Sequence, residues 1–258
     1  MTEIPVVRIG DGTGIPILGF GTWQLHGRQA YDAIRWALDA GYRHIDTATM
    51  YKNEAEVGRA IRDSGLDRGD LFLTTKLPPG NAGRERNTIE DSLRALGTQY
   101  VDLWLVHWPP RRKGDSERIW RAFTGIRDDG LAHFIGVSNY STAQVDELAA
   151  ATGQTPAVNQ VPWSVGGGHD ARLLSEFRER GVVVEGYSPL KDTRLSNPVL
   201  VQIADAHAVT PAQVVLRWHV QLGIVVIPRS SKRERIVANA DLFGFALTDQ
   251  EMERLSSL

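Results

Sequence analysis

Cysteine is absent from the 258 residues of this chain. Its absence excludes disulfides, thiolate nucleophiles and cysteine-ligated zinc or iron–sulfur centres. Redox chemistry would therefore need a bound cofactor. The seven histidines are scattered without the spacing of a ligand set, so a metal hydrolase is a poor hypothesis and we expect no metal.

Excess charge of either sign is also lacking, because the formal net charge is −2. The molecule as a whole offers no broad field that would attract nucleic acid or an anionic membrane. No apolar run approaches the ~20 residues of a membrane span, and the first residues lack a signal-peptide pattern. We expect a cytoplasmic monomer without nucleic-acid or membrane partners.

Short β-branched runs alternate with amphipathic stretches along nearly the whole chain. This alternation is typical of parallel strands joined by helices, but a barrel and an open doubly wound sheet share it. The strand count of about eight favours a (β/α)8 TIM barrel, and a single domain over residues 1–258 is compatible with that fold. The candidate strands are residues 17–21, 44–46, 71–76, 101–106, 134–137, 157–160, 182–187 and 224–227.

Local signals mark several boundaries. Asp-Gly and Thr-Gly between apolar residues predict an N-terminal β-hairpin over residues 8–15. Capping boxes begin helices at Thr210 and at Ser141, each with glutamine three residues later. A further helix is expected after Thr248.

Four ionisable residues stand at or just after three successive predicted strands. Asp46 ends the second strand, Tyr51 follows it, Lys76 ends the third and His107 follows the fourth. Each alone has an ordinary explanation, such as a helix cap or a packed ring. In a barrel, however, the carboxyl ends of the strands meet at one rim, where active sites form. We therefore expect these side chains to form one cluster.

The cluster suits proton donation to a carbonyl oxygen. Free tyrosine, with a pKa of about 10, is a weak acid at neutral pH, so Tyr51 would need a cationic neighbour. Lys76, held by Asp46, would lower the pKa of Tyr51, and His107 could hydrogen-bond the substrate oxygen. No side chain donates hydride, so a nicotinamide cofactor is expected.

The cofactor is not expected to bind in Rossmann fashion, because the glycines at 10, 12 and 14 precede the first barrel strand. A basic segment follows the last predicted strand, from Arg229 to Arg235, and precedes a predicted helix. Barrels often bind phosphate at this place, and arginines suit a 2′-phosphate. The segment therefore favours NADPH.

At these residues the sequence resembles the aldo-keto reductase family over essentially the whole chain. The resemblance rests on Gly41–Ala48 with Tyr51, Asn53, Glu54, Val57 and Gly58, on Leu103–Pro109, and on Ile227–Ser230. It implies Tyr51 as general acid, Lys76 and Asp46 as its tuning pair, and His107 as the residue that orients a small-molecule carbonyl substrate.

The resemblance also implies a set of binding residues. Trp23 and Trp108 would form apolar walls of the substrate pocket, beside Tyr51 and His107. Contacts with NADPH are implied for Ser138, Asn139, Gln160, Tyr187, Ser188, Leu190, Arg229, Ser230, Lys232, Arg235 and Asn239.

Several positions depart from the common family pattern. Leu77-Pro78-Pro79 stands where a tryptophan is frequent, and Val161-Pro162-Trp163-Ser164-Val165 replaces Glu-x-His-Pro, which makes Trp163 a candidate new pocket wall. Ala238 stands where a glutamate often contacts adenine. Without the long C-terminal loop of many eukaryotic members, we expect an open pocket for small aldehydes, dicarbonyls or keto sugars.

Two other functions stay open at this point. Lys76 could form a Schiff base in a barrel aldolase, since a strand-end lysine near tyrosine and aspartate suits that chemistry. A nucleotide-sensing regulatory subunit of the same family, as potassium-channel β subunits partly are, would keep the fold without rapid turnover.

Overall fold

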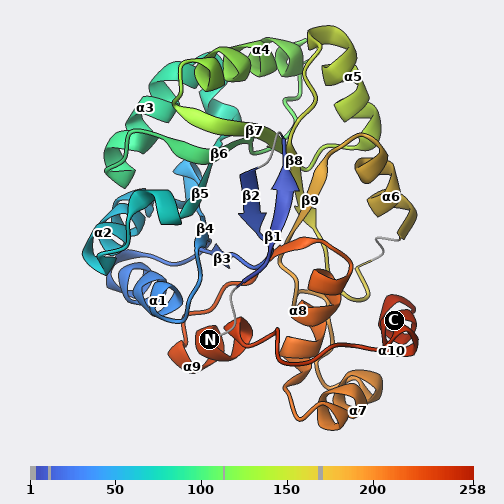
Figure 1. Cartoon of the computed structure of the whole chain (residues 1–258). Coiled ribbons are helices and arrows are strands. Elements are labelled where there is room, and N and C mark those ends of the chain that lie inside the picture. The colour runs from blue at the N-terminus through green and yellow to red at the C-terminus, as the bar shows by residue number, and fades with distance from the viewer. Residues whose placement is uncertain (1–3, 11–12, 113, 168–170) are drawn as a thin grey trace.

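A barrel of parallel strands surrounded by helices forms the centre of the protein (Figure 1). The computed structural model describes residues 4–10, 13–112, 114–167 and 171–258. One sheet holds eight strands in sequential order: β3 (Phe20–Gly21), β4 (His44–Asp46), β5 (Phe72–Leu77), β6 (Val101–Val106), β7 (Ala132–Ser138), β8 (Val158–Pro162), β9 (Val183–Tyr187) and β10 (Val225–Ile227).

The two edges of this sheet meet. A parallel bridge joins Leu18 to Val226, and backbone hydrogen bonds connect Gly19 and Gly21 to the oxygens of Val226 and Pro228. Closure removes the exposed strand edges that an open sheet would leave. The predicted (β/α)8 fold is thereby confirmed, and the open doubly wound sheet is wrong.

The predicted N-terminal hairpin is also confirmed, although Thr13-Gly14, expected in a turn, lies in its second strand and the expected Asp11-Gly12 turn lies outside the described residues. β1 (Val6–Ile9) pairs antiparallel with β2 (Thr13–Pro16). Ile9 and Ile15 pack with residues near the amino ends of the barrel strands, among them Phe72 and Val158. The hairpin thus closes the amino end of the barrel interior and leaves the carboxyl ends of the strands to other elements.

Helices cover the outer face of the sheet (Figure 1). Their apolar stripes bury, for example, Ile34 and Leu38 in the outer core, as the helical spacing predicts. The helices are α1 (Gly27–Asp39), α2 (Glu54–Ser64), α3 (Glu85–Leu96), α4 (Asp115–Asp128), α5 (Thr142–Thr152), α6 (Ala171–Glu179), α7 (Pro198–Ala206), α8 (Pro211–Gln221), α9 (Arg233–Ala240) and α10 (Asp249–Ser256), with short 3-10 turns η1 (Thr49–Tyr51), η2 (Arg68–Asp70) and η3 (Pro79–Asn81).

The predicted helix starts are correct. Ser141 and Thr210 accept hydrogen bonds from the backbone of Gln144 and Gln213, and both reciprocal capping bonds are formed. Thr248 forms a third capping box with Glu251 at the start of α10. These side chains satisfy amide groups that a helix start leaves without an internal partner.

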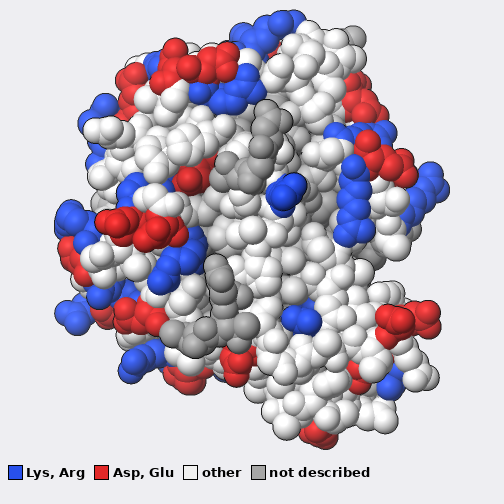
Figure 2. All heavy atoms as spheres, viewed as in Figure 1, with Lys and Arg blue, Asp and Glu red and all other residues white. Residues whose placement is uncertain are grey.

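The visible face of the molecule has no large area of one charge (Figure 2). Basic and acidic side chains alternate around its periphery. Across the described residues, no single helix is long and apolar enough to cross a membrane; α7 and α8 reach that length and composition only together, as a pair bent by 85°.

Candidate active site

Lys76 and Asp46 form a buried ion pair at the carboxyl ends of β5 and β4. The Lys76 Nζ lies 2.7 Å from both carboxylate oxygens of Asp46 and donates a third hydrogen bond to the Thr47 backbone oxygen at 2.8 Å. The lysine side chain has no exposed surface. Burial lowers the pKa of Lys76, but the negative charge of Asp46 outweighs burial, and the pKa lies above its usual value. Lys76 is therefore a fixed cation.

Tyr51 is placed beside this cation by η1, the short turn that follows β4. The Lys76 Nζ lies 5.1 Å from the centre of the Tyr51 ring. Burial raises the pKa of Tyr51, and this effect exceeds the lowering by Lys76. The lysine thus acts in the direction expected from the sequence, but the net pKa is raised, and the expected net lowering is wrong. Tyr51 is accordingly a protonated phenol at neutral pH, which is the form a proton donor needs.

His107 packs edge-on against Tyr51, with ring centres 5.7 Å apart. Burial, together with the charge of Lys76, lowers the pKa of His107 to about 3. The imidazole is therefore neutral over the physiological range. Its Nδ1 is buried and has no hydrogen-bond partner among the described residues. A neutral ring at this position can donate one hydrogen bond to a substrate oxygen. The structure thus brings the four predicted catalytic residues into one cluster.

The same geometry argues against a Schiff-base aldolase. A nucleophilic lysine must reach its neutral form, which requires a lowered pKa. Lys76 instead donates hydrogen bonds to the Asp46 carboxylate and to the Thr47 backbone oxygen, and its pKa is raised. Its ammonium group is fully buried, so it does not face a substrate.

Several predicted cofactor residues surround the cluster on the next strands. Tyr187, at the end of β9, donates a hydrogen bond of 2.8 Å to the side-chain oxygen of Asn139, which follows β7. Asn139 and Ser188 adopt left-handed backbone conformations, with φ of 65° and 54°. Such conformations in residues other than glycine are uncommon and cluster at functional sites. Ser138, at the end of β7, donates to the backbone oxygen of Gln160.

Gln160 belongs to the catalytic cluster itself. Its side-chain amide donates to the Asp46 carboxylate at 2.8 Å. The residue is almost fully buried, so this amide nitrogen orients Asp46 toward Lys76. The sequence suggested only a cofactor contact for Gln160, and its contact with Asp46 was not anticipated.

The basic segment predicted to bind phosphate leads into α9. Arg229, Lys232 and Arg235 are exposed, and within the described ranges none of them forms an ion pair with a carboxylate. α9 begins after Lys232 without a side-chain cap, which leaves amide groups for an anion. A Cβ at Gly21 would lie 3.0 Å from the Ile227 oxygen, so β3 passes close to this segment. Ser230 and Asn239 are buried there, while Leu190 lies half-buried after β9. These residues fit an anionic nucleotide.

Exposed apolar side chains stand near the cluster. Trp23 and Trp108 are 53% and 45% exposed, and Met50, directly before Tyr51, is 50% exposed. The loop that carries Trp23 is fixed by Asn53, whose buried amide donates to the backbone oxygens of Thr22 and Leu25. Three large apolar groups exposed at one rim are typical of a pocket wall. The sequence did not single out Met50.

Trp163 is not part of this wall. It is 2% exposed and packs in the outer core, and its backbone oxygen accepts a hydrogen bond from His219 of α8. The interpretation of Trp163 as a new pocket wall is therefore wrong.

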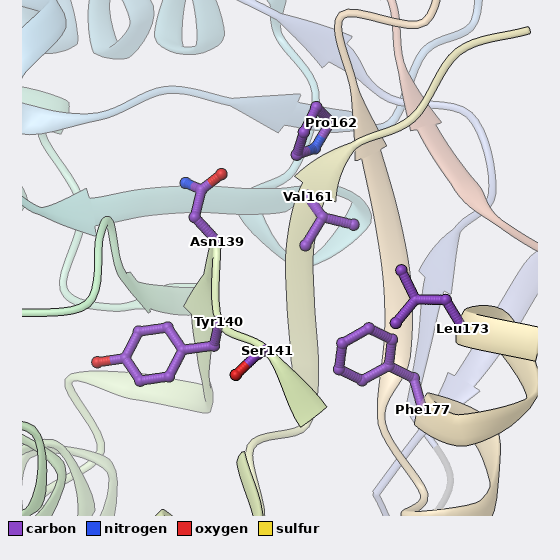
Figure 3. Close-up of a pocket in the computed structure, with 7 residues that line it drawn as sticks. All are labelled: Asn139, Tyr140, Ser141, Val161, Pro162, Leu173 and Phe177. Atoms are coloured by element: carbon purple, nitrogen blue, oxygen red, sulfur yellow. The ribbon is translucent and has the colours of Figure 1, made fainter. Parts of the chain in front are cut away.

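A separate apolar pocket of about 210 Å³ lies outside the barrel wall (Figure 3). Val161 lines it opposite Leu173 and Phe177 of α6. Because side chains alternate along a strand, Val161 points outward where Gln160 points inward. This pocket therefore lies on the opposite side of β8 from the catalytic cluster, and Asn139 also lines it.

Comparison with known proteins decides the family. Residues 17–258 match the aldo/keto reductase family. The chain belongs to the aldo-keto reductase family. It is 41% identical to a 2,5-diketo-D-gluconic acid reductase B from Corynebacterium sp. over all of this chain and 94% of that protein. It is also 41% identical to a morphine 6-dehydrogenase from Pseudomonas putida, over 98% and 91% of the two chains.

Solved structures of other aldo-keto reductases share the fold closely. One from Brucella melitensis superposes with a TM-score of 0.96 at 40% identity, covering 100% of this chain and 98% of that one. One from Bombyx mori, solved in complex with NADP, superposes with a TM-score of 0.92 at 30% identity, covering 100% and 93%. This aldo-keto reductase is therefore an oxidoreductase enzyme.

Two polar residues of the barrel interior were missed. Glu185 of β9 and His44 of β4 are fully buried, and the His44 Nε2 lies 3.6 Å from Glu185 Oε1. The available signal was a carboxylate inside an apolar strand, two residues before Tyr187 and thus on the same face. Buried ionisable groups near an active site are functional candidates.

Proposed function

We propose that this aldo-keto reductase reduces aldehydes and ketones to alcohols with NADPH, and that Tyr51 donates the proton. The observation that carries the proposal is the buried Lys76–Asp46 pair beside a protonated Tyr51. A neutral His107 stands next to the phenol. Two of the relatives are named as a 2,5-diketo-D-gluconic acid reductase B and a morphine 6-dehydrogenase, and these names support an oxidoreductase reaction.

NADPH, when bound, would supply hydride to the carbonyl carbon. Three exposed cations of the basic segment before and in α9, Arg229, Lys232 and Arg235, would hold its phosphates, with Arg235 and Arg229 suited to the 2′-phosphate. Asn139, Ser138 and Gln160 would face the carboxamide, and Tyr187 would stack on the nicotinamide. Ser188, Leu190, Ser230, Lys232 and Asn239 would line the remaining length. The NADP complex of the Bombyx mori enzyme supports this choice of cofactor.

The chain's own residues provide the acid side of the reaction. His107 donates a hydrogen bond to the carbonyl oxygen and orients it toward Tyr51. As negative charge develops on that oxygen, the Tyr51 hydroxyl transfers its proton, and the O–H bond of the alcohol forms. Lys76 stabilises the phenolate left behind, while Asp46 and Gln160 hold Lys76 in place. Solvent returns the proton to Tyr51.

The substrate we propose is a small aldehyde, dicarbonyl compound or keto sugar. Trp23, Met50 and Trp108 offer apolar contact at an exposed rim, and such a rim selects weakly for substrate size. The diketogluconate reductase relative supports carbonyl groups on polar carbon chains.

A panel of carbonyl compounds, followed at the nicotinamide absorbance with NADPH, tests the proposal. We expect turnover of short aldehydes and dicarbonyls by the wild type and by Tyr31→Phe, a control whose hydroxyl bonds Asp63 on the outer surface. Tyr51→Phe should show almost none. Turnover by Tyr51→Phe at the wild-type rate would contradict the assignment of Tyr51.

A further inference from the structure

Glu185 is a buried carboxyl group that the proposed reaction does not use. It lies on β9, in register with Gln160 of β8 and Val225 of β10, and no part of it is exposed. Both of its carboxyl oxygens are buried, and among the described residues neither makes a hydrogen bond of standard geometry, although the Gln160 amide lies near enough to act on the carboxyl. A carboxylate in such a place loses its hydration without full replacement, which is costly in free energy.

The surroundings of Glu185 connect it to the catalytic cluster. Gln160, its neighbour in register, donates to Asp46, which holds Lys76. On the other side, His44 of β4 lies 3.6 Å away, and the same His44 nitrogen contacts Thr74 of β5 at 3.2 Å. Glu185 is thus separated from the Lys76–Asp46 pair by a single side chain.

The charge state of Glu185 follows from these neighbours. Burial and the negative charge of Asp46 raise the pKa of Glu185 to about 8, although Lys76 and the side-chain amide of Gln160 both act in the opposite direction. Burial and Lys76 lower the pKa of His44 to about 3. At neutral pH both groups are therefore uncharged. The ionisable groups that face this region are His44, Asp46, Lys76, Tyr51 and Tyr187.

We propose that Glu185, fully buried beside Gln160 and His44, is a positioning residue that acts on Tyr51 through the charge of Lys76. This inference rests on the proposed role of Tyr51 as proton donor. When Glu185 ionises, a second anion competes for Lys76, and its negative charge raises the pKa of Tyr51. Glu185 would thus weaken Tyr51 as an acid in alkaline solution only.

Glu185→Gln keeps the shape of the side chain but cannot ionise, so it isolates the effect of the negative charge of Glu185. In protein interiors a unit charge at about 10 Å moves a pKa by about one unit. We therefore expect the titration midpoint of Tyr51 to fall by about one pH unit in this variant. The midpoint is measured from tyrosinate absorbance. Subtracting the curve of Glu185→Gln/Tyr51→Phe from that of Glu185→Gln isolates Tyr51 in the variant. Subtracting the curve of Tyr51→Phe from that of the wild type isolates Tyr51 in the native protein.

Carbonyl reduction gives the second readout. In Glu185→Gln we expect kcat/KM at pH 7 within about twofold of the wild type. The variant should lack the loss of rate that Glu185 ionisation near pH 8 causes in the wild type, and the decline caused by Tyr51 ionisation should begin about one pH unit lower. Glu54→Gln is the matched control, because Glu54 is also a buried carboxyl but bonds Thr75 and is not among the groups that shift the pKa of Tyr51. It should leave the Tyr51 midpoint unchanged.

The outcomes separate the two proposals. An unchanged Tyr51 midpoint in Glu185→Gln, an equal shift in Glu54→Gln, or a uniform loss of activity at every pH would overturn the role of Glu185. The absorbance titration needs no turnover, so it tests Glu185 even if Tyr51→Phe remains fully active and the proposed reaction fails.

Discussion

Both carboxylate oxygens of Asp46 lie 2.7 Å from the ammonium group of Lys76, in a place where neither side chain reaches solvent appreciably. Two charges in this setting stabilise each other, and removal of one leaves the other buried and unpaired. The pair also fixes the cation that faces Tyr51. Its disruption should therefore affect both stability and catalysis.

Asp46→Asn tests this pair. We expect the free energy of unfolding to fall by about 3–5 kcal/mol and kcat for carbonyl reduction to fall at least tenfold. Urea unfolding and steady-state kinetics measure the two effects. Asp102→Asn is the control, because Asp102 lies on β6 of the same sheet and pairs with Arg68 of η2 at 2.6 Å. It should lose stability but keep its kcat per folded molecule; wild-type kcat in Asp46→Asn would contradict the account.

Arg235→Ala tests the nucleotide site. A charge-assisted hydrogen bond contributes about 1.5–3 kcal/mol, so the Kd for NADPH should rise roughly tenfold or more, while the Kd for NADH changes little. Fluorescence titration of both nucleotides measures this. Arg233→Ala removes a neighbouring exposed cation and should change neither Kd by more than about threefold. Equal losses for NADPH and NADH in Arg235→Ala would remove this arginine from the 2′-phosphate site.

The acid side of the pH profile tests the charge of His107. The pKa of its imidazole is lowered to about 3, so the ring stays neutral between pH 5 and 7. We expect kcat/KM to be flat across this range. A folded pKa below the unfolded value also means that His107 reduces stability as the pH falls from about 6.5 toward 3. A break in kcat/KM near pH 6.5 that disappears in His107→Asn would show that the imidazole is charged.

Gly58→Ala tests the packing of α2, the helix that follows Tyr51, against α3. A Cβ at this position of α2 would lie 2.2 Å from the backbone oxygen of Leu96, so α2 and α3 approach too closely for a side chain. Gly58→Ala should destabilise the protein by about 1–3 kcal/mol or more. Gly125→Ala, in α4 with open space around it, should be neutral or stabilising by up to about 1 kcal/mol. Equal thermal midpoints for the two variants would contradict this packing.

Much of the fold could be predicted because the strands are short apolar runs with clear caps between them. The first barrel strand is the exception: residues 17–21 were expected as one strand, but β3 is Phe20–Gly21 with a bridge at Leu18. This segment is defined by closure against residues 226–228, which lie at the other end of the chain. Local pattern does not report such a contact.

The catalytic residues could be predicted because each follows a strand, and a barrel brings strand ends together. The local sequence pattern does not reveal long-range contacts or side-chain direction, as three residues show: Glu185, Gln160 and Trp163. The hydrogen bond from Gln160 to Asp46 joins residues 114 positions apart, and the same fold buries Glu185 beside them. Trp163 follows a strand end as the catalytic residues do, but its side chain turns into the outer core.

Proton transfer from Tyr51 is tested most directly by the rate of hydride transfer in a single turnover. Tyr51→Phe removes the proton and should slow that step about 10²–10⁴-fold. The Kd for NADPH in the same variant should stay near the wild-type value, and Tyr31→Phe should match the wild type in both. Single-turnover hydride transfer in Tyr51→Phe within about threefold of the wild type, at saturating NADPH, would contradict the account.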